Sequence, residues 1–193
     1  MSAPRLFRVR VGPISARMNT RFPCLLTLAL LLALPAAAAE TKKPVAAAHT
    51  TAAGPKPIGK FEDWTAATHQ ESGASVCYAF TRVQSSAPTL PGRGAVVLTV
   101  TERASGRDAV AIEAGFPYAA NATVTVQVDQ NGLEFYTAGR NAFARDGKAA
   151  VAAFGKGSRA IARSPAPKEV TDTFSLKGFG DAYKAIVKAC PAK

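Results

Sequence analysis

Apolar residues recur at every second position in several separate segments of this chain. In the clearest segment Val124, Val126 and Val128 alternate with polar residues, and similar runs cover residues 96–101, 110–116 and 173–176. This period is that of a β-strand with one buried face. Short strands of this kind favour antiparallel pairing. The sequence therefore predicts an all-β fold, an antiparallel β-sandwich that is immunoglobulin-like in outline.

A turn signal follows the run that ends at Val128. Asn131-Gly132 suits the type I′ turn of a two-residue hairpin, because both central residues of that turn need positive φ. We therefore expect a tight hairpin with its turn at Asn131-Gly132.

Two segments depart from the period of two and predict helices. Residues 144–156 are rich in alanine and end in Gly155-Lys156-Gly157, which predicts a short internal helix with a glycine stop. Residues 181–190 predict a C-terminal helix that Asp181 caps. One stripe of this helix is apolar and ends at Cys190, so this cysteine is expected to face inward.

A second cysteine has a setting that suits this helix. Cys77, Ala79 and Thr81 form a small-residue face of a predicted strand, on which a helix can pack closely. The helix can therefore bring Cys190 to Cys77, and we predict a disulfide between them. On the chain-entropy model a bond closing so long a loop contributes about 4.7 kcal/mol. The alternative is two free thiols, which an oxidising compartment disfavours.

Residues 1–39 predict a cleaved export signal. Arg21 precedes an apolar run of 13 residues, Phe22 to Leu34, and Ala37-Ala38-Ala39 offers a small-residue cleavage site. The run is too short for a membrane-spanning helix, which needs about 20 residues. A buried helix or a membrane anchor is the alternative. Met18 is the expected true start, so the basic stretch before it is a long n-region or an overextended start.

Cleavage after residue 39 sets the organisation of the remainder. Residues 40–57 are rich in Ala, Pro and Lys and predict a disordered tether. Residues 58–193 predict a single β domain with one core. The processed chain keeps 19 basic and 13 acidic residues, a formal charge of +6, and Cys24 leaves with the signal. We expect a periplasmic, outer-membrane associated or secreted protein with no transmembrane span after processing.

The positive charge is dispersed, which favours a solvated surface over a nucleic-acid site. Arg103 and Arg107 flank a predicted turn at Ala104-Ser105-Gly106 and are expected to form an exposed basic group that steers binding to an anionic surface. No nucleic-acid partner is expected.

No catalytic, cofactor or metal site emerges from the sequence. His69 is the one histidine of the predicted domain and is expected at an exposed strand end, and both cysteines of the domain are assigned to the bridge. A pair of carboxylates distant in the chain remains an open catalytic alternative. Trp64, the only tryptophan, is expected in the core, with a ligand anchor as the alternative.

Several motifs resemble one known family. They are Phe61-Glu62-Asp63-Trp64, Cys77-Tyr78-Ala79, the segment 133–137, and the segment 171–179 with the helix that follows to Cys190. In this order they resemble the invasion-associated locus B family. The resemblance implies an exported β-rich protein of Gram-negative bacteria, in a family named for a member linked to host-cell invasion.

Two positions depart from the family pattern. Residues 164–170 stand where family members often carry Arg-Gly-Thr. If that arginine binds a partner in the family, this chain lacks the function or uses Lys168 instead. The alternative is a loop whose sequence varies freely. Phe143 stands where a tryptophan is expected, and we expect it to serve the same core packing.

These observations predict an exported, non-catalytic interaction domain of the envelope with a role in host-cell association. Its partner is an unidentified envelope or host-surface protein, or an anionic surface. The competing hypothesis is a periplasmic envelope-maintenance factor without a host partner.

Overall fold

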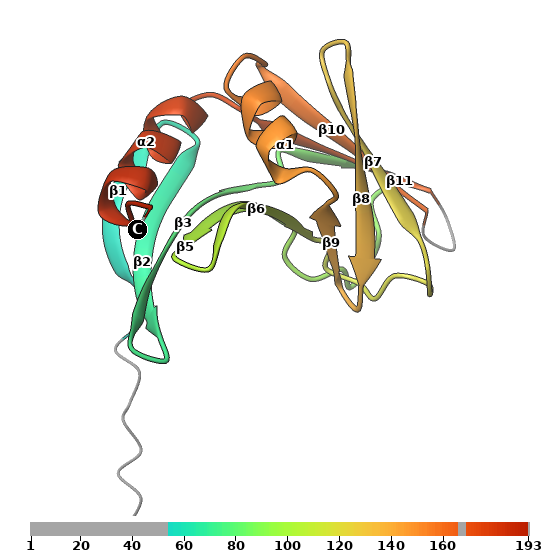
Figure 1. Cartoon of the computed structure of the whole chain (residues 1–193). Helices are drawn as coiled ribbons and strands as arrows, with labels where there is room; N and C mark the ends of the chain where they lie inside the picture. The colour runs from blue at the N-terminus through green and yellow to red at the C-terminus, as the bar shows by residue number, and fades with distance from the viewer. Residues whose placement is uncertain (1–53, 166–168, 193) are drawn as a thin grey trace, which may run out of the picture. The chain divides into compact units, whose positions relative to one another are not determined.

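A computed structural model describes residues 54–165 and 169–192 (Figure 1). The predicted signal segment, Cys24 and Lys168 lie outside the described residues. Within these ranges the chain forms eleven strands and two helices. The strands are β1 (Lys56–Phe61), β2 (Trp64–Glu71), β3 (Ala74–Arg82), β4 (Ser85–Ala87), β5 (Val97–Arg103), β6 (Gly106–Glu113), β7 (Thr123–Val128), β8 (Asn131–Ala138), β9 (Asn141–Ala144), β10 (Arg159–Ser164) and β11 (Val170–Ser175). The helices are α1 (Gly147–Phe154) and α2 (Phe179–Ala189).

All eleven strands belong to one antiparallel sheet, in the order β1-β2-β3-β5-β6-β9-β8-β7-β10-β11-β4. The chain passes directly from β3 to β4, which lies at the far end of this order. At the crossing, the Val83 N–H donates to the Val96 carbonyl at 3.1 Å and the Gln84 N–H donates to the Thr173 carbonyl at 2.8 Å. The strands from β3 round to β4 therefore close on themselves, and β1 and β2 extend beyond the ring. The predicted all-β antiparallel fold with an internal and a C-terminal helix is confirmed.

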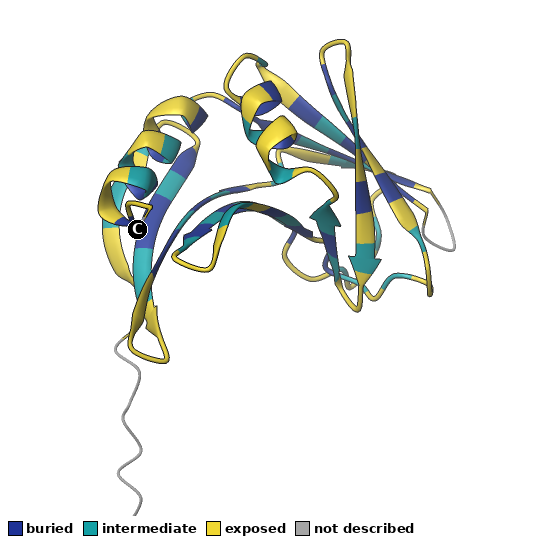
Figure 2. Ribbon diagram, viewed as in Figure 1, coloured by how far each residue is buried: buried dark blue, intermediate teal, exposed yellow. Residues whose placement is uncertain are grey.

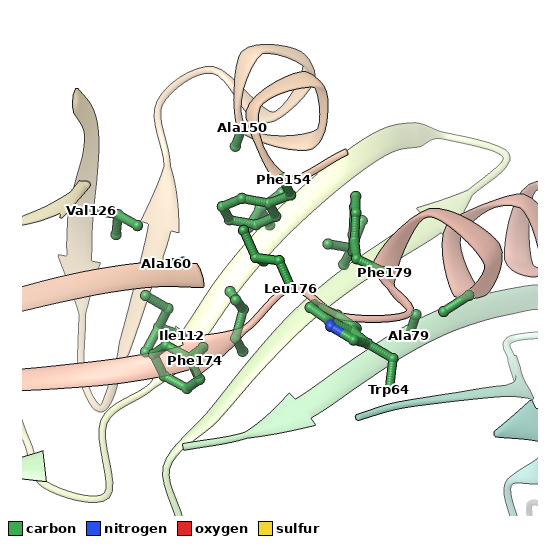
Figure 3. Packing of buried hydrophobic residues seen from close by; sticks show 14 of the residues in the cluster. Trp64, Ala79, Ile112, Val126, Ala150, Phe154, Ala160, Phe174, Leu176 and Phe179 are labelled. Atoms are coloured by element: carbon green, nitrogen blue, oxygen red, sulfur yellow. The ribbon is translucent and has the colours of Figure 1, made fainter. Parts of the chain in front are cut away.

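Both helices pack on the inner face of the sheet, where the buried residues gather (Figure 2). Phe179 of α2 lies between Trp64 of β2 and Phe154 of α1, at ring-centroid distances of 5.0 and 5.5 Å (Figure 3). Both contacts are edge-to-face, the geometry that aromatic rings prefer. Burying side chains of this size contributes about 1.5–3 kcal/mol each. One aromatic cluster thus joins the two helices to the sheet, and the core position predicted for Trp64 is confirmed.

The predicted helix ends need correction at the start of α2. This helix begins at Phe179, and its N-cap is Gly178 with φ of 83°, so the prediction that Asp181 caps it is wrong. Asp181 lies instead in the first turn, where its charge favours the helix dipole. Helix α1 lies within the predicted range, and Asp146 caps it by accepting from the Ala149 N–H at 2.9 Å.

Two boundaries differ from the sequence-based expectation. The hairpin between β7 and β8 is present, but its two turn residues are Asp129 and Gln130, because Val128 pairs with Asn131. Aspartate tolerates the positive φ of 50° at this turn, and the Gln127 side chain donates to the Asp129 carbonyl at 2.7 Å. Strand β1 begins at Lys56, inside the segment assigned to the tether.

Candidate functional site

Helix α2 is fixed to the sheet by the predicted disulfide. Cys77 of β3 and Cys190 at the end of α2 are bonded, with their Cα atoms 5.9 Å apart, and both are buried. Arg107 of β6 donates from Nη1 to the Cys190 carbonyl at 2.5 Å. The end of the helix is therefore held by one covalent bond and one charge-assisted hydrogen bond.

A buried cluster of charges lies beneath the same helix. Glu102 is 0% exposed, and Nε of Arg107 lies 2.6 Å from its Oε2. The Asp108 N–H donates to the other Glu102 oxygen at 3.2 Å, and the Tyr183 hydroxyl donates to Asp108 Oδ1 at 2.5 Å. Burial raises the pKa of Glu102, and burial together with Asp108 raises the pKa of the Tyr183 hydroxyl. These groups anchor α2.

The expectation that Arg103 and Arg107 form a free basic group is wrong. The turn at Ala104-Ser105 is present, but Arg107 pairs with buried Glu102 and Arg103 donates to both oxygens of Glu71 at 3.0 Å. The guanidinium of Arg103 and the side chain of His69 hold the pKa of Glu71 down at about 2. Both arginines are therefore paired with acids, Arg103 with a residue distant in the sequence and Arg107 with a near one.

A second buried ion pair closes the ring of strands. Arg93 and Asp172 form two parallel hydrogen bonds of 2.8 and 2.7 Å, and their side chains are 7% and 1% exposed. Ser86 of β4 donates to Asp172 at 2.7 Å, and Arg93 Nε donates to the Ala114 carbonyl at 2.7 Å. The guanidinium also lies 4.9 Å from the centroid of the Phe116 ring. Because both side chains of this pair have hydrogen-bond partners within the protein, we assign the pair a structural role. Sequence reasoning did not find it.

The outer face of the sheet carries a different kind of feature. Eight residues on eight neighbouring strands lie directly opposite one another and point away from the core; we call them the outer row. In order they are Lys60, Thr65, Phe80, Thr99, Ala111, Phe143, Tyr136 and Thr123. None of the eight is fully buried, whereas their chain neighbours Trp64, Leu98, Ile112, Ala142, Phe135 and Val124 are.

Near its far end the outer row contains an aromatic pair on β8 and β9, followed by Thr123 of β7. Tyr136 is 45% exposed and stacks on Phe143, with ring centroids 5.5 Å apart and planes 29° apart. Arg145 lies 6.0 Å from the centroid of the Tyr136 ring and pairs with Glu134 at 3.5 Å. The expectation that Phe143 packs in the core is wrong, because its register with Ala111 and Tyr136 places it on the outer face.

The outer row begins at a hollow on β1, β2 and β3. The hollow has a volume of about 310 Å³, and Lys60, Thr65, Phe80 and Arg82 are among the residues that line it. Its two acids, Glu62 and Asp63, lie near Lys177, whose Nζ is 2.9 Å from Glu62 and whose pKa both acids raise. Within the described ranges Lys60 and Arg82 form no ion pair, so the hollow presents two unpaired cations, together with these acids, beside the ring of Phe80.

His69 lies next to this aromatic region. It is on β2, half-buried, 2.9 Å from Glu71 Oε1 and edge-on to Tyr78 at a centroid distance of 5.5 Å. Tyr78 in turn stacks on Phe80 at 6.1 Å. Sequence reasoning singled out His69 but placed it at an exposed strand end. In the part of the chain that the structure describes, no three His, Cys, Asp or Glu side chains gather as a metal site would need.

The fold and these sites define an antiparallel β domain whose C-terminal helix is held by a disulfide and whose outer sheet face carries the outer row with its aromatic pair. A family model described as "Invasion associated locus B (IalB) protein" matches residues 64–187, and the chain belongs to this family. The expected resemblance is thus confirmed.

A solved structure supports the fold. The chain is similar to invasion associated protein B from Bartonella henselae, with a TM-score of 0.51 and 20% identity. The similarity covers 68% of this chain and 95% of that protein. No curated protein matches the chain. Over residues 54–165 and 169–192, neither helix has the length and hydropathy needed for crossing a membrane.

Proposed function

We propose that this protein is an exported, non-catalytic interaction domain of a Gram-negative envelope, and that it takes part in association with host cells. One observation carries this proposal: the outer row presents an exposed tyrosine and half-buried aromatics on a face that neither helix covers. Exposed aromatic and arginine side chains are enriched in binding surfaces. The family name supports the host-cell setting, and the predicted signal at residues 1–39 supports export.

Location and cell association test this proposal together. The protein recovered from envelope fractions is expected to begin within two residues of Glu40 by mass spectrometry, and to react with a labelling reagent that does not cross the outer membrane. A strain lacking the gene should adhere less to cultured host cells, and the Tyr136→Ala protein should not restore adhesion.

Two results would count against the proposal. Retention of the protein in the periplasm, with adhesion unchanged in the deletion strain, would favour the envelope-maintenance hypothesis. An activity with measurable turnover, lost in the Glu71→Gln or His69→Ala protein with the fold intact, would contradict the non-catalytic assignment.

A further inference from the structure

We propose that the outer row binds a linear acidic polysaccharide of the host cell surface. This inference rests on the proposed function and names the partner of the same surface. The chain of such a polysaccharide would cross the strands from the hollow at Lys60 and Arg82 to the aromatic pair Tyr136 and Phe143.

The chemistry of the outer row suits sugar rings. The C–H faces of a pyranose ring pack against the faces of aromatic side chains, while its hydroxyl groups need hydrogen-bond partners. Phe80, Phe143 and Tyr136 supply aromatic surface, of which Tyr136 is the most exposed, and Thr65 and Thr99 lie beside them in the row. Both threonines are half-buried and lie in the same register as the rings.

The charges along the outer row select an acidic chain. Lys60 and Arg82 lie at one end without an ion pair among the described residues, and Arg145 lies at the other end beside Tyr136, where an exposed pair with Glu134 at 3.5 Å leaves it open to water. Neighbouring strands are about 4.8 Å apart, so the five steps from β1 to β9 separate these cations by up to about 24 Å along the sheet. Charges spread over this length match a polymer that repeats its carboxylates or sulfates, rather than one compact anionic headgroup.

The acids on the same face argue against nucleic acid. Glu113 lies on the outer face of β6, and Glu134 lies beside Arg145 on β8. A nucleic acid carries a phosphate at every nucleotide, so its binding surfaces concentrate cations and exclude acids. In an acidic polysaccharide the charges are borne by sugar rings that also pack on aromatic side chains, so its binding does not rest on cations alone and leaves room for these carboxylates.

Heparin oligosaccharides of defined length provide the probe, with dextran as the neutral polymer. Binding of the processed protein is measured by titration calorimetry at two salt concentrations. Heparin should bind and dextran should not, and affinity should fall as salt rises because exposed ion pairs are screened. Short oligosaccharides that cannot reach from Lys60 to Tyr136 should bind at least tenfold more weakly than long ones.

Two variant pairs separate the outer row from general charge. Lys60→Glu with Arg82→Glu should lower heparin affinity at least tenfold. The matched control, Lys148→Glu with Lys188→Glu, makes the same charge change on the exposed sides of α1 and α2 and should lower it less than threefold. Tyr136→Ala should weaken binding about tenfold and keep its salt dependence, while Tyr136→Phe should bind as the wild type does. Thermal unfolding of each variant establishes that it is folded.

Several results would overturn the inference. One is an equal loss of heparin affinity in the two charge-reversal variants, and another is wild-type heparin affinity in the Tyr136→Ala protein. The others are dextran binding as tight as heparin binding, and lipopolysaccharide vesicles that bind more tightly than heparin. Enzymatic removal of both sulfated and carboxylated polysaccharides from host cells separates the inference from the proposed function. If cell association survives this treatment, the inference of a polysaccharide partner is overturned, while the proposed function is still supported. Heparin binding without any cell association would overturn the proposed function alone.

Discussion

Among the described residues Arg107 is the one cation paired with the fully buried carboxylate of Glu102, and its Nε lies 2.6 Å from Oε2. The same guanidinium donates to the carbonyl of Cys190. One side chain therefore neutralises a buried charge and also holds the end of α2. Breaking a buried pair by removing one partner costs more than the pair contributes, because a charge is left without compensation.

We therefore predict that Arg107→Ala lowers the free energy of unfolding by about 3–5 kcal/mol at neutral pH, measured by urea denaturation. Arg103→Ala is the matched control. Its pair with Glu71 lies at the surface, so the loss should stay below about 1 kcal/mol. Similar losses in the two variants would contradict the structural role assigned to Arg107.

The pH dependence of stability provides a test of Glu102 itself. Burial raises the pKa of Glu102, so between its unfolded value near 4.5 and its folded value the native state binds more protons than the unfolded state. In this window the contribution of Glu102 makes stability fall as pH rises. The contribution of Glu71 makes stability rise with pH, because its pKa is lowered from 4.5 to about 2 in the folded protein. That effect lies below pH 4.5, outside this window.

Glu102→Gln should therefore flatten the decline in unfolding free energy between pH 4.5 and 7. Urea denaturation of both proteins at several pH values measures this difference. A difference between wild type and variant that stays constant across this range would show that Glu102 keeps an ordinary pKa.

The ion pair of Arg93 and Asp172 predicts strong coupling. Asp172→Asn should cost about 3 kcal/mol, because it leaves a nearly buried guanidinium without its counter-charge. Arg93→Met in the same protein should restore part of the loss, giving a coupling energy of about 1–3 kcal/mol in a double-mutant cycle. Additive losses would mean that each side chain acts through its other hydrogen bonds alone.

The disulfide closes a loop with a sequence separation of 113 residues. Replacing both cysteines, Cys77→Ser with Cys190→Ser, should lower the free energy of unfolding by about 4.7 kcal/mol on the chain-entropy model. Wild-type protein unfolded and measured in a reductant should match this variant. The oxidised protein should yield a linked Cys77–Cys190 peptide on digestion, and a reductant without effect on stability would contradict the prediction.

Local patterns in the sequence were sufficient for part of this structure. The alternation at residues 123–128 predicts β7 because one face of that strand is buried along its whole length. The pairing of Cys77 with Cys190 was predictable because the helix stripe and the small-residue face each come from a short segment. The position of the turn after Val128 was not predictable from the sequence. Asn131-Gly132 is the usual signal for positive φ, but Asp129 adopts the positive φ instead.

The candidate site depends on relationships that no local pattern contains. Phe143 and Tyr136 become neighbours on the outer face only through the register of β8 and β9. Apolar residues on both faces of these strands gave no sign of which face was inward. The buried partners Glu102 and Arg107 are near in sequence, but their burial depends on α2, which arrives from the far end of the chain. Arg93 and Asp172 likewise meet only because the strands close into a ring.

Two glycines near the start of α2, Gly178 and Gly180, differ in what a side chain would meet. Gly178 has φ of 83°, and a Cβ atom there would collide with the backbone carbonyl of Phe61. Gly178→Ala should therefore cost at least about 2 kcal/mol, of which the left-handed conformation alone accounts for about 1–2 kcal/mol. Gly180 lies two residues further on, inside the helix, and a Cβ atom there would meet nothing within 4 Å. Gly180→Ala should stabilise the protein by about 0.5–1 kcal/mol, because alanine loses less backbone entropy in a helix. Fluorescence of Trp64, which contacts Phe179, follows both unfolding transitions, and a shift in the same direction for both variants would refute this account of the helix start.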